Sequence, residues 1–124
     1  MRSREHDIQC GCVTWFRVRY PREIIFAIPN GGARNVATGV ALKEEGVLAG
    51  VPDLMVLSAR GGYHGLFVEM KKSSVGVRGQ LVGRGHLSAV QKELFPRIEE
   101  KGYKIEVCYS FDDFEKVVTE YMNQ

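Results

Sequence analysis

Apolar residues recur along the chain with two different spacings, which predict alternating helices and strands. Spacings of three and four residues, as at Leu87, Val90, Leu94 and Ile98, indicate an amphipathic helix. Short apolar runs bounded by Gly, Pro and Asn indicate strands. We expect helices at residues 3–18, 36–45, 87–101 and from Ser110 onwards, and strands at residues 24–28, 54–57, 66–71 and 103–109.

The order of these elements, α-β-α-β-β-α-β-α, predicts an α/β fold. A mixed sheet of three or four strands should lie at its centre, flanked by helices. The strands at residues 54–57 and 66–71 are expected to form one central hairpin, because turn-forming glycines separate them. The uninterrupted apolar run at residues 24–28 predicts a strand that is buried on both faces.

Length and composition narrow the class of protein. With 124 residues, 44% hydrophobic and 26% charged, the chain is expected to form one globular domain over residues 1–124. It shows neither a membrane-length apolar run nor a signal-peptide pattern, so we expect a cytoplasmic protein with no membrane partner. Cys10, Cys12 and Cys108 match neither a disulfide framework nor zinc-ligand spacing, and are interpreted as free thiols. A net charge of +2 does not by itself indicate a nucleic-acid partner.

Three charged residues flank the central hairpin. Asp53 precedes its first strand, whereas Glu69 and Lys71 lie two apart in the second and so point to one face. In an antiparallel hairpin, Asp53 would lie beside them. Carboxylates are the hard ligands of Mg²⁺ and Mn²⁺, and a nearby lysine can orient water or stabilise charge on phosphorus. This set suits metal-dependent phosphodiester hydrolysis; the alternative is an exposed strand face with a salt bridge.

The sequence around these residues resembles a nuclease family. Pro52-Asp53 followed by Glu69-Met70-Lys71 is similar to the PD-(D/E)xK signature, and the surroundings resemble its VRR-NUC branch. The similar features follow in the family's order over roughly residues 5 to 122: Pro29-Asn30-Gly31-Gly32, Leu42-Lys43, the stretch 46–53, Glu69-Met70-Lys71, Gln91 and Gly102-Tyr103. This resemblance implies a restriction-endonuclease-like fold.

The resemblance also implies a chemistry and a substrate. Asp53, Glu69 and the backbone carbonyl of Met70 would hold one or two Mg²⁺ or Mn²⁺ ions, and Lys71 would position or activate the attacking water. Stand-alone members of this size, from bacteria or phages, are similar to Holliday-junction resolvases and act as homodimers. We therefore expect a metal-dependent DNA endonuclease that is specific for branched or junction DNA and forms a homodimer.

Two more residues gain a role from the resemblance. Glu5 matches a first-helix glutamate that reaches the metal in several PD-(D/E)xK nucleases; otherwise it only complements the helix dipole. Gln91, in Ser88-x-x-Gln91, matches a glutamine beside the metal site that can hydrogen-bond the attacking water or a phosphate. The alternative is that Ser88 caps a helix and Gln91 lies on the surface.

The turn that follows the first strand is a candidate phosphate contact. Gly31 and Gly32 would let backbone N–H groups approach a phosphate, with Asn30 and Arg34 beside them. The alternative is a tight turn without a binding role.

Residues 72–86 contain no acid and are interpreted as a long, basic, glycine-rich loop. Lys72, Arg78 and Arg84 are expected to contact DNA phosphates. Interleaved apolar residues leave a small hairpin or a dimer contact as the alternative.

Two functions of other classes compete with the nuclease. A non-catalytic DNA-binding module would keep the fold without cutting, and a protein-interaction domain would show no salt-dependent DNA binding. The complete set of Asp53, Glu69 and Lys71 favours the nuclease over the first of these, and activity without a partner would distinguish it from the second.

Overall fold

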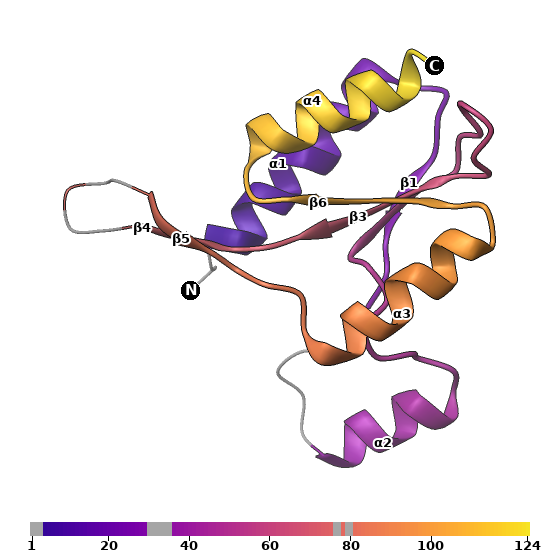
Figure 1. Cartoon of the computed structure of the whole chain (residues 1–124), viewed down its shortest axis with the longest axis vertical. Helices are drawn as coiled ribbons and strands as arrows, with labels where there is room; N and C mark the ends of the chain where they lie inside the picture. The colour runs from indigo at the N-terminus through magenta and orange to yellow at the C-terminus, as the bar shows by residue number, and fades with distance from the viewer. Residues whose placement is uncertain (1–3, 30–35, 76–77, 79–80) are drawn as a thin grey trace.

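A computed structural model describes residues 4–29, 36–75, 78 and 81–124 (Figure 1). The elements are α1 (Arg4–Arg19), β1 (Ile25–Ala27), α2 (Val36–Glu44), β2 (Leu54–Val56), β3 (Leu66–Met70), β4 (Ser73–Val75), β5 (Leu81–Arg84), α3 (Ala89–Glu100), β6 (Lys104–Cys108) and α4 (Phe111–Met122). The order expected from the sequence is confirmed, and β4 and β5 are added to it. Each helix in these ranges is too short or too polar to cross a lipid bilayer.

The central sheet has the strand order β1-β2-β3-β6. β2 pairs antiparallel with both β1 and β3, whereas β3 and β6 run parallel. Parallel neighbours need a crossover, and α3 lies in the connection that makes it. The predicted mixed α/β sheet with the hairpin β2–β3 at its centre is therefore confirmed.

The hydrophobic core lies between this sheet and helices α1 and α4, which lie side by side (Figure 1). Alternation along the strands turns every second side chain toward these helices. Fully buried residues of the sheet and helices meet there: Leu54, Val56, Leu66, Val68, Cys12, Phe16, Phe114, Val118 and Tyr121. Helix α3 packs on β6 from the opposite side (Figure 1).

Two burial predictions were wrong. β1 is an edge strand, so Ile25 is buried but Phe26 is 40% exposed, and the strand is not covered on both faces. On α3, Val90 is 50% exposed, and the buried residues are Gln91, Leu94 and Phe95. Leu94 of the apolar stripe is buried, but the polar Gln91 takes the buried position at the start of the helix in place of Val90.

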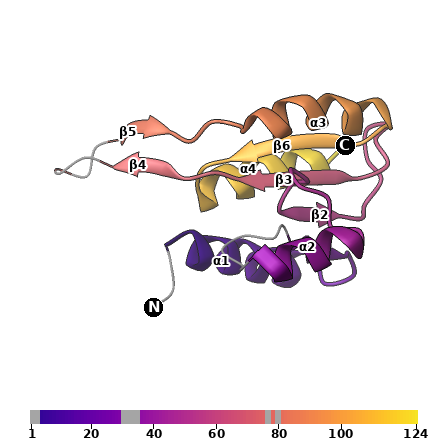
Figure 2. The same ribbon diagram turned by 90° about the horizontal axis from the view of Figure 1, so that it is seen from below.

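The expected long loop at residues 72–86 was also wrong over much of its length. β4 and β5 pair antiparallel, with Ser73 opposite Arg84 and a register shift at Ser74/Val75. They project away from the sheet beyond the end of β3 (Figure 1 and Figure 2). The alternative of a small hairpin is confirmed.

Candidate active site

The hairpin register brings the predicted acids together at one end of the sheet. A tight turn at Gly61 and Gly62, with φ of +56° and +87°, lies between β2 and β3. Leu54 is opposite Val68, so Asp53 lies just before one strand where Glu69 lies in the other. The predicted proximity of the two acids therefore follows from the register.

The loop before β2 fixes Asp53 against the neighbouring elements. Its backbone carbonyl accepts a hydrogen bond from Ile28 N–H at 2.8 Å, and its carboxylate accepts one from Met70 N–H at 2.8 Å. Gly50 has φ of +92°, and a Cβ there would lie 2.8 Å from a methyl of Val90 on α3. Only glycine fits this close approach without strain, which explains the glycine three residues before Asp53.

Glu69 is the buried member of the pair. Its residue is only 5% exposed, and one carboxylate oxygen lies 3.3 Å from Lys71 Nζ. The other oxygen has no hydrogen-bond partner within the described part of the chain. A salt bridge between Glu69 and Lys71 does exist, but the alternative of an exposed strand face is wrong.

Burial and neighbouring negative charge disfavour the charged forms of these acids. Burial raises the pKa of Asp53 above its ordinary range, and the charge of Glu5 raises it further, against the Met70 N–H, Glu69 and Lys71. Burial also raises the pKa of Glu69, as does the charge of Asp53, while Gln91 and Lys71 act in the opposite direction. The two carboxylates are thus destabilised in their charged forms, and a bound cation would stabilise them.

Gln91 links the start of α3 to this site. Its side-chain oxygen accepts from the Ser88 backbone N–H at 3.1 Å, and its backbone N–H donates to Ser88 Oγ at 3.2 Å. The two bonds together make a capping box. The Gln91 residue is only 6% exposed, and its side chain lowers the pKa of Glu69. Ser88 caps the helix as the alternative held, but the surface position that it gave Gln91 is wrong.

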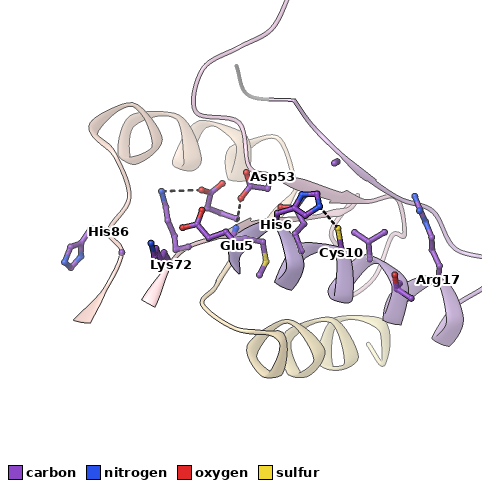
Figure 3. A pocket seen from close by; sticks show the side chains of 15 residues that line it. Glu5, His6, Cys10, Arg17, Asp53, Lys72 and His86 are labelled. Carbon is purple, nitrogen blue, oxygen red and sulfur yellow. Dashed lines mark hydrogen bonds and ion pairs between the residues drawn. The ribbon is translucent and has the colours of Figure 1, made fainter. Parts of the chain in front are cut away.

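A cavity of about 930 Å³ opens at these residues. Asp53, Glu69, Met70 and Lys71 line it from the sheet, and Glu5 lines it from α1 (Figure 3). Within the ranges that the structure describes, no three His, Cys, Asp or Glu side chains gather closely enough to hold a metal ion by themselves. Glu5 thus faces the same cavity without completing a three-acid cluster.

The family model for the VRR-NUC domain matches residues 1–112. The chain belongs to the VRR-NUC domain family. A solved structure described as a "VRR_NUC domain protein" is 26% identical, with a TM-score of 0.72 over 99% of this chain and 91% of that chain. No curated protein matches. VRR-NUC domains are nuclease-type domains of the PD-(D/E)xK superfamily, so the predicted family and fold are confirmed.

Not every residue expected to contact DNA can be placed in this VRR-NUC domain. Lys72 lines the cavity, Arg78 is exposed and Arg84 is the last residue of β5. The residues of the expected phosphate-binding turn, Asn30, Gly31, Gly32 and Arg34, lie outside the described residues.

Sequence analysis did not identify most of the residues that line the cavity along α1. His6, Gln9, Cys10, Thr14 and Arg17 line it there. They recur three and four residues apart, which is the spacing of one helix face, and this was the available signal.

Proposed function

We propose that this VRR-NUC domain is a divalent-metal-dependent endonuclease that hydrolyses DNA phosphodiester bonds. The pair of Asp53, which is half-buried, and Glu69, which is buried, carries the proposal. One oxygen of Glu69 has no hydrogen-bond partner among the described residues, although an unsatisfied buried carboxylate costs free energy. Because both acids line an open cavity beside Lys71, the missing partner is best supplied by a ligand that enters from solvent.

The ligand set suits Mg²⁺ or Mn²⁺. The carboxylates of Asp53 and Glu69 are hard oxygen ligands, and Mg²⁺ is often held by one or two carboxylates while it keeps several waters. Met70 donates its N–H to Asp53, and in an extended strand the carbonyl of the same residue points to the same side. A bound cation would supply Lewis acidity that polarises the phosphodiester and acidifies a water molecule.

Residues around the carboxylates would have distinct tasks. Lys71 lines the cavity with its Nζ 3.3 Å from Glu69, so it can orient the attacking water or stabilise charge that develops on the phosphate. Gln91, whose side chain is held by the helix cap, lowers the pKa of Glu69 and so favours its carboxylate form, and we assign it an assisting role with the water or a phosphate. Glu5 adds negative charge that favours cation binding.

We further propose that basic residues beside the cavity contact the DNA backbone. Lys72 lies at its edge, and Arg78 is an exposed cation between β4 and β5, in a projecting hairpin that also contains Arg84. Such contacts neutralise phosphates and position the duplex without reading sequence. Gly31 and Gly32, with Asn30 and Arg34, are proposed as a further phosphate contact from the sequence alone.

Branched or junction DNA and a homodimer are the substrate and assembly that we propose. Both rest on the small size of the chain and its family. A two-fold symmetric dimer would present two equivalent sites to the two symmetric strands of a four-way junction. Size-exclusion chromatography with light scattering tests the assembly independently of activity, and a monomer that cuts junctions would contradict this part.

The decisive experiment is a cleavage panel of duplex, flap and four-way DNA with Mg²⁺, Mn²⁺ or EDTA. We expect cleavage with either cation, none in EDTA, and loss of cleavage in Lys71→Ala with DNA binding retained. Lys92→Ala is the matched control, because Lys92 is exposed on α3 and does not line the cavity. Full activity of Lys71→Ala would end the proposed mechanism. DNA binding without any cleavage would identify a non-catalytic module instead.

A further inference from the structure

The cavity does not stop at the carboxylates but continues along helix α1. Cys10, Thr14 and Arg17 line it at successive helical spacings, so one face of the helix forms a wall (Figure 3). Arg17 lies farthest along this wall from Asp53 and Lys72 (Figure 3). At 1.5 Å per residue, the wall from Glu5 to Arg17 is about 18 Å long.

The part of the cavity that runs along α1 from Glu5 to Arg17, the α1 groove, has an uneven distribution of charge. The acids that line it lie together at one end: Glu5, Asp53 and Glu69. The charge of Glu5 is close enough there to raise the pKa of Asp53. The remaining polar lining consists of bases and neutral donors, including Thr14 and Arg17. An anionic chain could therefore follow the groove and meet negative charge only at the candidate metal site.

At the far end of the groove, the Arg17 side chain is anchored by a hydrogen bond to the sheet. Its guanidinium donates to the carbonyl of Ile25 over 3.3 Å, and Ile25 lies in β1, one of the two edge strands of the four-stranded sheet. A guanidinium has five N–H donors, so this bond leaves several for another acceptor. Anchoring on the sheet edge also reduces the side-chain entropy that a phosphate contact would cost.

We propose that the α1 groove holds the sugar–phosphate backbone of one nucleic-acid strand, and that Arg17 binds a phosphate remote from the cut. Measured along a duplex axis, a length of about 18 Å corresponds to roughly five nucleotides of one strand, at about 3.4 Å each. The inference deepens the proposed nuclease function and rests on it, because the carboxylate end marks the scissile phosphate. It predicts that substrate length on one side of the cut governs affinity.

The first test measures binding of fluorescein-labelled thymidine oligonucleotides by fluorescence anisotropy in EDTA. Wild-type affinity should rise with length until a strand reaches Arg17, and Arg17→Ala should stop that rise several nucleotides earlier. For a strand of about 12 nucleotides we expect roughly fivefold weaker binding and a salt slope reduced by about 0.7.

The matched control is Arg19→Ala, which removes the same charge two residues away. Arg19 is exposed and stacks on the Tyr20 ring, with 5.0 Å from its guanidinium carbon to the ring centroid, and it does not line the groove. Its oligonucleotide affinity and length dependence should match those of the wild type. Equal losses in the two variants would reduce the effect to net charge and overturn the proposal.

The second test uses Cys10 as a built-in reporter of the groove. Cys10 is exposed and lines it, whereas Cys12 and Cys108 are buried and burial raises the pKa of each thiol to about 12. Iodoacetamide should therefore label Cys10 selectively. A saturating strand of about 12 nucleotides should slow labelling severalfold, and thymidine monophosphate should not. An unchanged labelling rate in saturating oligonucleotide would overturn the proposal.

These readouts separate the groove from the chemistry. The groove proposal would be overturned, and the nuclease proposal kept, by metal-dependent cleavage in a protein whose Cys10 is not protected and whose Arg17→Ala variant binds like the wild type. Protection of Cys10 and the Arg17 effect without cleavage on any substrate would sink the nuclease and leave a strand-binding groove.

Discussion

A carboxylate lies beside a cation near each end of strand β2, but only one of the two carboxylates has partners for both of its oxygens. Beyond Val56, Ser58 donates to one oxygen of Glu23, and the other oxygen lies 3.4 Å from an Arg60 nitrogen. Tyr121 donates to the Ser58 carbonyl at 2.6 Å and so ties α4 to this group. Both oxygens of Glu23 therefore have partners.

Before Leu54, the arrangement is incomplete. Glu69 shares one oxygen with Lys71, and its other oxygen lacks a hydrogen-bond partner in the described chain. Burial raises the pKa of both Asp53 and Glu69, and the charge of Asp53 raises that of Glu69 further. A satisfied network rigidifies a fold, whereas a buried group left unsatisfied lowers stability and marks a place where function is the explanation.

Glu69→Gln should break the comparison most strongly. The variant keeps the size of the side chain but loses a ligand charge, so we expect cleavage to fall on the order of 10³-fold. Its metal-free melting temperature at neutral pH should rise, because the site disfavours the Glu69 carboxylate despite Lys71. Cleavage kinetics and thermal unfolding of the same preparation check both effects.

The result has a clear contrary outcome. A variant that loses both activity and stability would show that Glu69, like Glu23, forms an ion pair that stabilises the fold. The proposed ligand role would then lose its main support.

Tyr121→Phe should show the reverse behaviour at the other end of β2. The change removes only the hydroxyl that binds the Ser58 carbonyl and leaves that carbonyl without this donor. We expect a loss of about 1–3 kcal/mol in the free energy of unfolding, with kcat unchanged. Urea denaturation and cleavage assays measure the two quantities. A fall in kcat of the folded variant would mean that the two ends of β2 are coupled.

The pH dependence of stability sharpens the same contrast. Because folding raises the pKa of Asp53 and Glu69, the folded protein binds more protons than the unfolded chain between the ordinary and the raised values. The free energy of unfolding therefore falls as pH rises through that window, which begins at about pH 4.

Melting temperatures of metal-free wild type and Glu69→Gln test this sign. The advantage of the variant should grow from about pH 4 to neutral pH, and Mg²⁺ or Mn²⁺ should stabilise only the wild type appreciably. A difference that stays constant with pH would show that the Glu69 charge is not the cause.

The sequence was sufficient for the acidic end of β2 because local rules decide it. Alternation along β3 puts Glu69 and Lys71 on one face, and the glycine turn makes the hairpin that brings Asp53 opposite. Helices α1 and α2 were predicted to within one residue at each end where their bounds are described. The role assigned to Gln91 came from family resemblance, and its burial fits that role without testing it.

Tertiary contacts decided what the sequence could not. An apolar run does not reveal that β1 is an edge strand, because its neighbours are set by the order of the sheet. The interleaved glycines and valines before α3 fit a loop and a hairpin equally well, and only pairing selects β4 and β5. Arg17 is an ordinary helix residue until the sheet edge lies beside it.

Ser88→Ala should produce the smallest effect and the most specific one. It removes the hydroxyl that accepts from the backbone N–H of Gln91, so we expect about 1 kcal/mol less stability. The Ser88 backbone N–H still donates to the Gln91 side chain, but the loosened start of the helix should displace that side chain beside Glu69 and lower kcat about two- to fivefold. Ser110→Ala is the matched control, because Ser110 caps α4 through Asp113 N–H at 3.1 Å, outside the site. It should cost similar stability and leave kcat unchanged. If both cap variants lower kcat equally, general loosening of the fold explains the loss; if only Ser88→Ala does, the cap of α3 belongs to the active site.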